Sequence, residues 1–124
     1  MTYADTILTK EGGIYAIYSI YPSGEEELIY IGKTYRPFEQ RFLEHKTNWR
    51  FDNQYLYQLM REEEPKVKNF IFYPFLPLSD LKTPDPLTNS QLEAIELALI
   101  TLYQPRGNIQ GRTQQYHFSS IITD

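Results

Sequence analysis

The chain has 124 residues, a formal net charge of −4 and no cysteine, which fits one domain with a single hydrophobic core and excludes disulfides and thiolate metal sites. No apolar run approaches the roughly 20 residues of a membrane span, and the first ten residues are too polar for a signal peptide, so we expect a soluble cytoplasmic protein without membrane contact. The negative charge argues against tight non-specific binding of nucleic acid, although Lys and Arg gather between positions 33 and 50 and could form a local basic surface.

The first predicted element is an antiparallel β-hairpin. Residues 13–21 alternate apolar and aromatic side chains, and residues 28–32 form a second apolar stretch. The turn sequence Pro22-Ser23-Gly24 lies between them. The two strands carry closely similar triplets, Gly13-Ile14-Tyr15 and Tyr30-Ile31-Gly32.

The tyrosines and glycines of these triplets are candidates for a functional site. Tyr15 and Tyr30 lie on adjacent strands and could point to one face of the sheet. There a phenol beside a lysine such as Lys33, or beside metal-bound water, could act as a general base, or the two rings could simply pack the sheet. Gly13 and Gly32 weaken a strand, which indicates that the backbone comes close to a neighbouring group.

Two helices are predicted next. Pro37 suits the first turn of a helix, and apolar residues follow at helical spacing to about Trp49. On this helix Arg41 and His45 are four residues apart and share a face, a pairing that suits a phosphate but that also occurs on surfaces without function. A second helix, capped by Asp52 or Asn53, is expected to end before residue 65.

The remaining elements are a strand and a long helix. Residues 69–78 predict a third strand, in which Pro74 indicates a sheet edge or a bulge. After a proline-rich loop over residues 81–87, Ser90-Gln91-Leu92-Glu93 fits a capping box, and the helix is expected to end near Tyr103. The segment from Asn108 onward is predicted to be a polar, loosely ordered tail. The fold class is therefore α/β, with a small central three-stranded antiparallel sheet flanked by helices.

The last helix carries a carboxylate on its apolar side. Leu92, Ile95, Leu99 and Leu102 form the predicted apolar stripe, and Glu96 lies on the same face. A carboxylate in that place costs free energy unless it reaches solvent, pairs with an arginine or binds a cation. Glutamate oxygens are natural ligands of Mg²⁺ or Mn²⁺, so a metal site is one of three interpretations.

Together these motifs resemble the GIY-YIG nuclease family, which includes intron-homing endonucleases, some restriction enzymes, small stand-alone proteins and the catalytic domain of the bacterial excision-repair incision subunit. The resemblance rests on the two triplets and on four later residues in order, Arg41, His45, Glu96 and Asn108. It covers about residues 12–111 and is strongest to the repair branch in the segment LITLYQPRGN. It implies one GIY-YIG nuclease-like domain over residues 1–124, with a polar C-terminal tail.

The resemblance also implies an activity, namely metal-dependent endonuclease cleavage of DNA, duplex or branched, in repair or restriction. Glu96 would hold one Mg²⁺ or Mn²⁺, and Arg41 would clamp the scissile phosphate. Tyr15, which we favour over Tyr30, would help to remove a proton from the attacking water.

Three further residues receive roles from the same resemblance. Lys33 would lower the pKa of the phenol or position the water, and His45 would assist proton transfer or contact phosphate. Asn108 would orient the metal site or the substrate. Two alternatives stay open: a protein that binds nucleic acid or regulates without hydrolysis, and a catalytic subunit that needs a protein partner for DNA affinity, docked through aromatic residues in 49–57 and 70–75.

Overall fold

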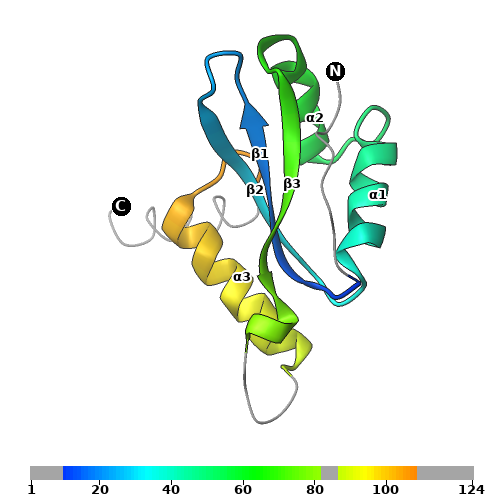
Figure 1. Ribbon diagram of the computed structural model, residues 1–124, viewed down its shortest axis with the longest axis vertical. Coiled ribbons are helices and arrows are strands. Elements are labelled where there is room, and N and C mark those ends of the chain that lie inside the picture. The colour runs from blue at the N-terminus through cyan, green and yellow to red at the C-terminus, as the bar shows by residue number, and fades with distance from the viewer. Residues whose placement is uncertain (1–9, 82–86, 109–124) are drawn as a thin grey trace, which may run out of the picture.

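A three-stranded antiparallel sheet forms the centre of the molecule, as predicted. In the computed structural model, which describes residues 10–81 and 87–108, the strands are β1 (Gly13–Ile20), β2 (Glu26–Thr34) and β3 (Asn69–Pro77). Their spatial order is β2-β1-β3, so the hairpin triplets lie on the central strand and on one edge strand (Figure 1). The second strand is longer than predicted, because Glu26 and Glu27 pair with the end of β1 despite their polarity.

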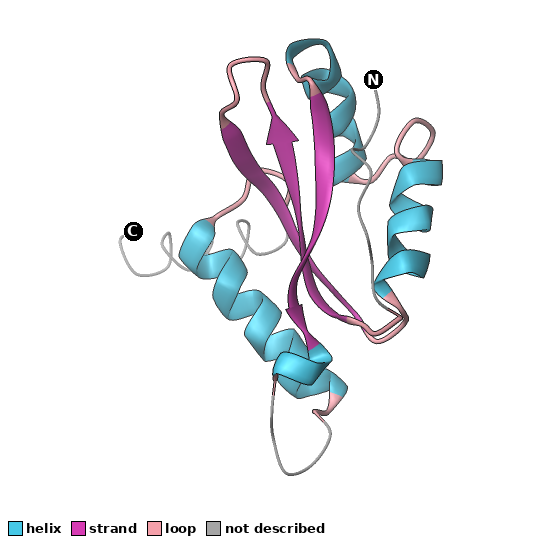
Figure 2. Ribbon diagram, viewed as in Figure 1, coloured by secondary structure: helices cyan, strands magenta, loops and turns pink. Residues whose placement is uncertain are grey.

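The helices cover both faces of the sheet. Helices α1 (Phe38–Asn48) and α2 (Tyr55–Glu63) pack on one face, and α3 (Asn89–Tyr103) packs on the other (Figure 2). Short 3₁₀ turns follow α2 at Glu64–Lys66 and follow β3 at Leu78–Asp80. No helix among the described residues combines the length and the apolarity needed to cross a membrane.

The two faces have separate hydrophobic cores. Four of the eight aromatic residues that could have formed a docking surface for a partner lie in the core under α1 and α2: Trp49, Tyr57, Phe70 and Phe72. Phe75 is partly buried against the other core. Because these rings are buried, the aromatic segments 49–57 and 70–75 serve mainly as core. Phe51, Tyr55 and Tyr73 are the exposed aromatic residues within these segments.

Some predicted helix boundaries are wrong. The N-cap of α2 is Gln54, and the Asp52 carboxylate instead accepts a hydrogen bond from the Gln54 backbone N–H. The capping box of α3 joins Thr88 to Gln91 rather than Ser90 to Glu93. Thr88 has the extended backbone that an N-cap requires, whereas Ser90 already lies inside the helix. The predicted end at Tyr103 is confirmed.

The apolar stripe of α3 also differs from the prediction. Leu102 is 71% exposed, and Ile100 is buried in its place. The buried contacts of α3 are made by Leu92 and Ile100, with Ile95 and Leu99 packed against the same core. The stripe is displaced because the sheet, and not helical spacing alone, decides which side of the helix is covered.

The prediction for Pro74 is confirmed in both of its forms. Strand β3 is an edge strand, and its pairing with β1 shifts register between Ile14 and Ala16. The shift lies opposite the segment between Tyr73 and Leu76, where a proline could not have donated a ladder hydrogen bond. The proline-rich segment 82–86 and the tail beyond Asn108 lie outside the described residues.

Candidate active site

The two hairpin tyrosines point to one face of the sheet, as predicted. The ring centroids of Tyr15 and Tyr30 are 6.1 Å apart, on the face that α1 and α2 cover. Tyr15 belongs to the central strand, is fully buried and stacks on Phe72 at 4.6 Å. Tyr30 belongs to the edge strand and keeps partial exposure. The two residues therefore differ in their exposure to solvent.

Gly32 is required by the position of the Tyr15 ring. The two residues are paired across β1 and β2, and a Cβ atom at position 32 would collide with the Tyr15 Cζ and hydroxyl. The expectation that this glycine permits close approach is confirmed, and the approaching group is a phenol. Gly13 is required for a different reason. Its φ is +143°, which side chains rarely allow, and a Cβ atom would collide with the Leu76 carbonyl.

We expect Gly32→Ala to destabilise the protein by about 1–3 kcal/mol, because the added methyl group must displace the Tyr15 ring from a packed core. Denaturant unfolding measures this change. In a Tyr15→Leu background the same substitution should cost clearly less, since the colliding ring is gone. Equal costs in both backgrounds would show that the Tyr15 ring is not what excludes a side chain here.

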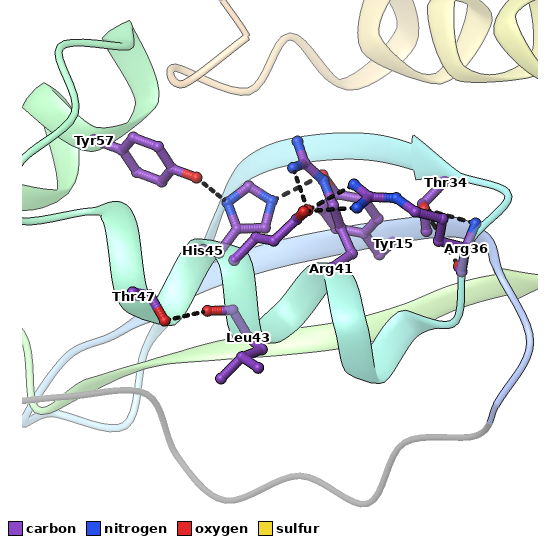
Figure 3. Close-up of polar contacts among 9 residues, drawn as sticks. Tyr15, Thr34, Arg36, Arg41, Leu43, His45, Thr47 and Tyr57 are labelled. Carbon is purple, nitrogen blue, oxygen red and sulfur yellow. Dashed lines mark hydrogen bonds and ion pairs between the residues drawn. The ribbon is translucent and has the colours of Figure 1, made fainter.

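Arg41 and His45 of α1 both contact the Tyr15 hydroxyl (Figure 3). The Arg41 Nε–H donates to the phenol oxygen at 3.1 Å, and His45 Nε2 lies 2.8 Å from the same oxygen. Arg41 and His45 therefore share a face of α1, as predicted, and this face is directed at the phenol of Tyr15. Burial raises the pKa of Tyr15 well above its usual value, Tyr30 adds to this effect and Arg41 opposes it.

His45 lies behind Tyr15, away from solvent. Its side chain is fully buried, and its second ring nitrogen, Nδ1, lies 2.8 Å from the Tyr57 hydroxyl. Burial lowers the pKa of His45 to about 3, and the charge of Arg41 contributes, so the imidazole is neutral at physiological pH. Direct contact with phosphate, one of the two predicted roles, is incompatible with this burial. The low pKa also disfavours uptake of a proton by the imidazole, so the position leaves His45 the task of holding the Tyr15 hydroxyl by a hydrogen bond.

The basic surface predicted around α1 is largely neutralised. Glu44 accepts a hydrogen bond from Arg41 at 2.9 Å and two from Arg36 at 2.6 and 2.7 Å. Hydrogen bonds from Arg36, with a further contribution from Arg41, lower the pKa of Glu44 to about 2. The Arg41 side chain nevertheless stays 24% exposed.

Glu96 reaches the edge of β2 from α3. Its carboxylate raises the pKa of Tyr30 and accepts a backbone hydrogen bond from Lys33. Burial raises the pKa of Glu96, and the Lys33 charge opposes that effect. In this structure the Lys33 charge therefore acts on the Glu96 carboxylate.

A cavity of about 270 Å³ opens where the elements from both faces meet at this edge. Tyr30 and Glu96 line it together with Gln54, Tyr55 and Ile100. The start of α2 and the second half of α3 thus approach each other around the edge strand. Candidate residues that are far apart in the sequence come together here in one solvent-accessible space.

Asn108 has a structural task at the same edge. Its side-chain oxygen accepts from the Ile31 N–H at 2.7 Å, and its side-chain nitrogen donates to the Ile31 carbonyl at 2.7 Å. The Gly107 N–H donates to the Ile29 carbonyl at 2.6 Å. Asn108 lines the cavity, but its amide pairs with β2 like a short extra strand, so this ordered residue fastens the segment after α3 to the sheet.

The residues at the cavity are compatible with one divalent cation of the magnesium type. Within residues 10–81 and 87–108, no group of three or more His, Cys, Asp or Glu side chains could enclose a metal. Mg²⁺, however, often retains several waters and binds one or two carboxylates plus substrate phosphates. Glu96, half-buried on the wall of a partly polar cavity, provides one such carboxylate.

Sequence reasoning missed three partners in this site. Glu44 lies three residues after Arg41, so helical spacing alone could have indicated the ion pair. Tyr57 has no sequence signal, because its contact with His45 depends on how α2 packs against α1. Tyr55 at the cavity wall has no sequence signal either.

No family model, curated protein or solved structure matches the chain. The α/β architecture with its antiparallel sheet is established from the structure directly.

Proposed function

We propose that the protein is a metal-dependent endonuclease that hydrolyses phosphodiester bonds in DNA. The observation that carries the proposal is the convergence of Tyr30, Arg41 and Glu96 from three separate elements at the edge of β2. Tyr30 and Glu96 line one cavity, and Arg41 is hydrogen-bonded to Tyr30. A cation, a phenol and a carboxylate next to one another are what phosphoryl chemistry needs. The resemblance to GIY-YIG nucleases supports the same reaction.

In this proposal Tyr30, rather than Tyr15, faces the attacking water. Tyr15 is fully buried, whereas Tyr30 lines the cavity. Burial and the Glu96 charge raise the pKa of Tyr30, while Arg41 and a hydrogen bond with Tyr15 oppose the rise. The phenolate form of Tyr30 accepts the proton of the attacking water and becomes the phenol. Tyr15 and His45 continue inward from Tyr30 as a hydrogen-bonded chain that fixes the position of its oxygen, and His45, whose pKa is lowered to about 3, stays neutral.

Arg41 contacts the phosphate and orients the phenols at the same time. Its Nε–H holds the Tyr15 hydroxyl, and Glu44 holds one terminal nitrogen. The side chain is 24% exposed, and the remaining N–H groups would bind a phosphate oxygen. Because two protein groups fix the side chain beforehand, little reorganisation is needed when charge develops on the phosphate.

Glu96 is the residue that would hold the divalent cation, Mg²⁺ or Mn²⁺. When bound, such a cation supplies positive charge that stabilises the phosphate and the leaving oxygen. Because burial raises the pKa of Glu96, a proton competes for the carboxylate, and cation affinity should increase as the pH rises through that pKa.

The test is cleavage of supercoiled plasmid and of branched oligonucleotides at low salt, with Mg²⁺ or Mn²⁺ and with a chelator. We expect cleavage only with the divalent ion, and a loss of roughly a hundredfold in Tyr30→Phe, which removes the group that accepts the proton. Tyr73→Phe, at an exposed position on β3, is the matched control and should cleave as the wild type does. Cleavage in the presence of chelator, or equal rates in the two variants, would contradict the proposal.

A further inference from the structure

We propose that the cavity beside Glu96 binds an unpaired nucleobase of the DNA strand, with the Tyr55 ring as its stacking surface. This inference deepens the proposed function and rests on it, because it names the substrate as DNA with unstacked nucleotides next to the scissile phosphate. Tyr55 and Gln54 begin α2 and line the same cavity as Tyr30 and Glu96.

The side chains of Tyr55 and Gln54 are exposed here, although the backbone of Gln54 serves as the N-cap of α2. The Tyr55 side chain is 40% exposed, although it is large and could have packed against the neighbouring core. Among the described residues, neither the Tyr55 ring and hydroxyl nor the Gln54 amide has a partner. An accessible ring next to an amide that can both donate and accept offers a base its stacking face and its polar edge.

The dimensions of the cavity favour one base. Its volume of about 270 Å³ lies just below the range of about 300–1,000 Å³ that small-molecule sites occupy. Leu56 and Ile100 give it apolar walls, and Tyr30 contributes a second ring. A double helix is too wide to enter, and its bases are already stacked on one another, so of the parts of a nucleic acid only an unpaired base fits.

The charge distribution also favours a source of DNA affinity other than contacts with phosphate. Besides Arg41, three arginines of the described chain form ion pairs with glutamates: Arg36, Arg50 and Arg106. Fewer cations are then available to release counterions from a DNA backbone. Stacking supplies affinity without positive charge, which fits an acidic protein that handles nucleic acid.

Fluorescence anisotropy tests the inference with wild-type protein in chelator, where cleavage is stopped. The probes are a labelled single-stranded oligonucleotide and the same sequence as a blunt duplex. We expect the single strand to bind more tightly, and Tyr55→Ala to weaken its binding roughly tenfold. Tyr55→Phe, which keeps the ring, and Tyr73→Ala, an equally exposed tyrosine on β3, should bind as the wild type does.

Each result has a definite meaning, provided that thermal melts show the variants folded, which exposure of both tyrosines leads us to expect. Equal affinity for duplex and single strand, or equal effects of Tyr55→Ala and Tyr73→Ala, would overturn the base site. Binding that depends on Tyr55 without any metal-dependent cleavage would support the base site and remove the proposed hydrolysis. Metal-dependent cleavage with Tyr55→Ala binding unchanged would do the reverse.

Discussion

Replacing Glu96 by glutamine is expected to reduce metal-dependent cleavage roughly a thousandfold, because the bound cation contributes several kcal/mol to the transition state and Glu96 is its only expected protein ligand. The substitution keeps the shape of the side chain, and an amide oxygen can still accept the hydrogen bond from the Lys33 backbone. Cleavage rates at saturating Mg²⁺ measure the effect.

The same substitution should leave the midpoint of thermal unfolding unchanged or slightly raised. The pKa of Glu96 is raised in the folded state, so the folded protein holds this proton more tightly than the unfolded chain does. At neutral pH the ionised carboxylate therefore costs folding free energy, and a neutral amide removes that cost. Activity and stability are expected to change in opposite directions, which is typical of a functional rather than a structural carboxylate.

Glu93→Gln provides the control on the same helix. Glu93 is exposed three residues earlier and affects Glu96 only through its charge. We expect cleavage close to that of the wild type. If Glu96→Gln cleaved as well as Glu93→Gln, the cation would have to be held elsewhere, and the assignment of Glu96 would be wrong.

Arg41→Ala is expected to lower the cleavage rate by about 10²–10³, the usual effect of removing one preorganised group that stabilises transition-state charge. Both the positive charge at the phosphate and the hydrogen bond to the Tyr15 hydroxyl are lost. Arg41→Lys should restore only part of the rate, since a lysine cannot contact Tyr15 and Glu44 through separate nitrogens in the same planar geometry.

The control for Arg41 is Arg36→Ala. Arg36 pairs with the same carboxylate, Glu44, but is more exposed, and its guanidinium hydrogen bonds go to Glu44 rather than to the Tyr15 hydroxyl. Single-turnover rates for the two variants separate loss of the ion pair from loss of the group at the phenol. Similar rates in Arg36→Ala and Arg41→Ala would show that only the Glu44 ion pair matters and that Arg41 does not act on the phosphate.

The architecture follows closely from local sequence patterns. Alternation of apolar residues predicts the hairpin, and spacing predicts α1 and the end of α3 at Tyr103. Errors lie at the starts of α2 and α3, where several residues could serve as the cap and backbone conformation decides among them. Pairing of Gly32 with Tyr15 is also predictable, because a hairpin brings the two triplets together.

In the candidate site, too, local patterns predict some features and tertiary contacts decide the others. Helical spacing places Arg41 and His45 on one face, and an acidic residue in an apolar stripe singles out Glu96. Contacts between elements that are distant in the sequence cannot be predicted from helical spacing or from the alternation of a strand. The pairing of His45 with Tyr57, of Lys33 with Glu96 and of Asn108 with the backbone of β2 all join residues at least 12 positions apart.

Residue type and local spacing thus establish the strands, the helices and the candidates for chemistry, because backbone geometry repeats every two residues in a strand and every 3.6 in a helix. Tertiary packing alone decides which candidate is buried and which is accessible. It encloses His45 and Tyr15, commits the Asn108 amide to the sheet edge and leaves Tyr30 facing the cavity. The physical reason is that elements distant in the sequence decide how far a side chain is buried and which partners it has. Burial and partners in turn set its protonation state and its access to substrate.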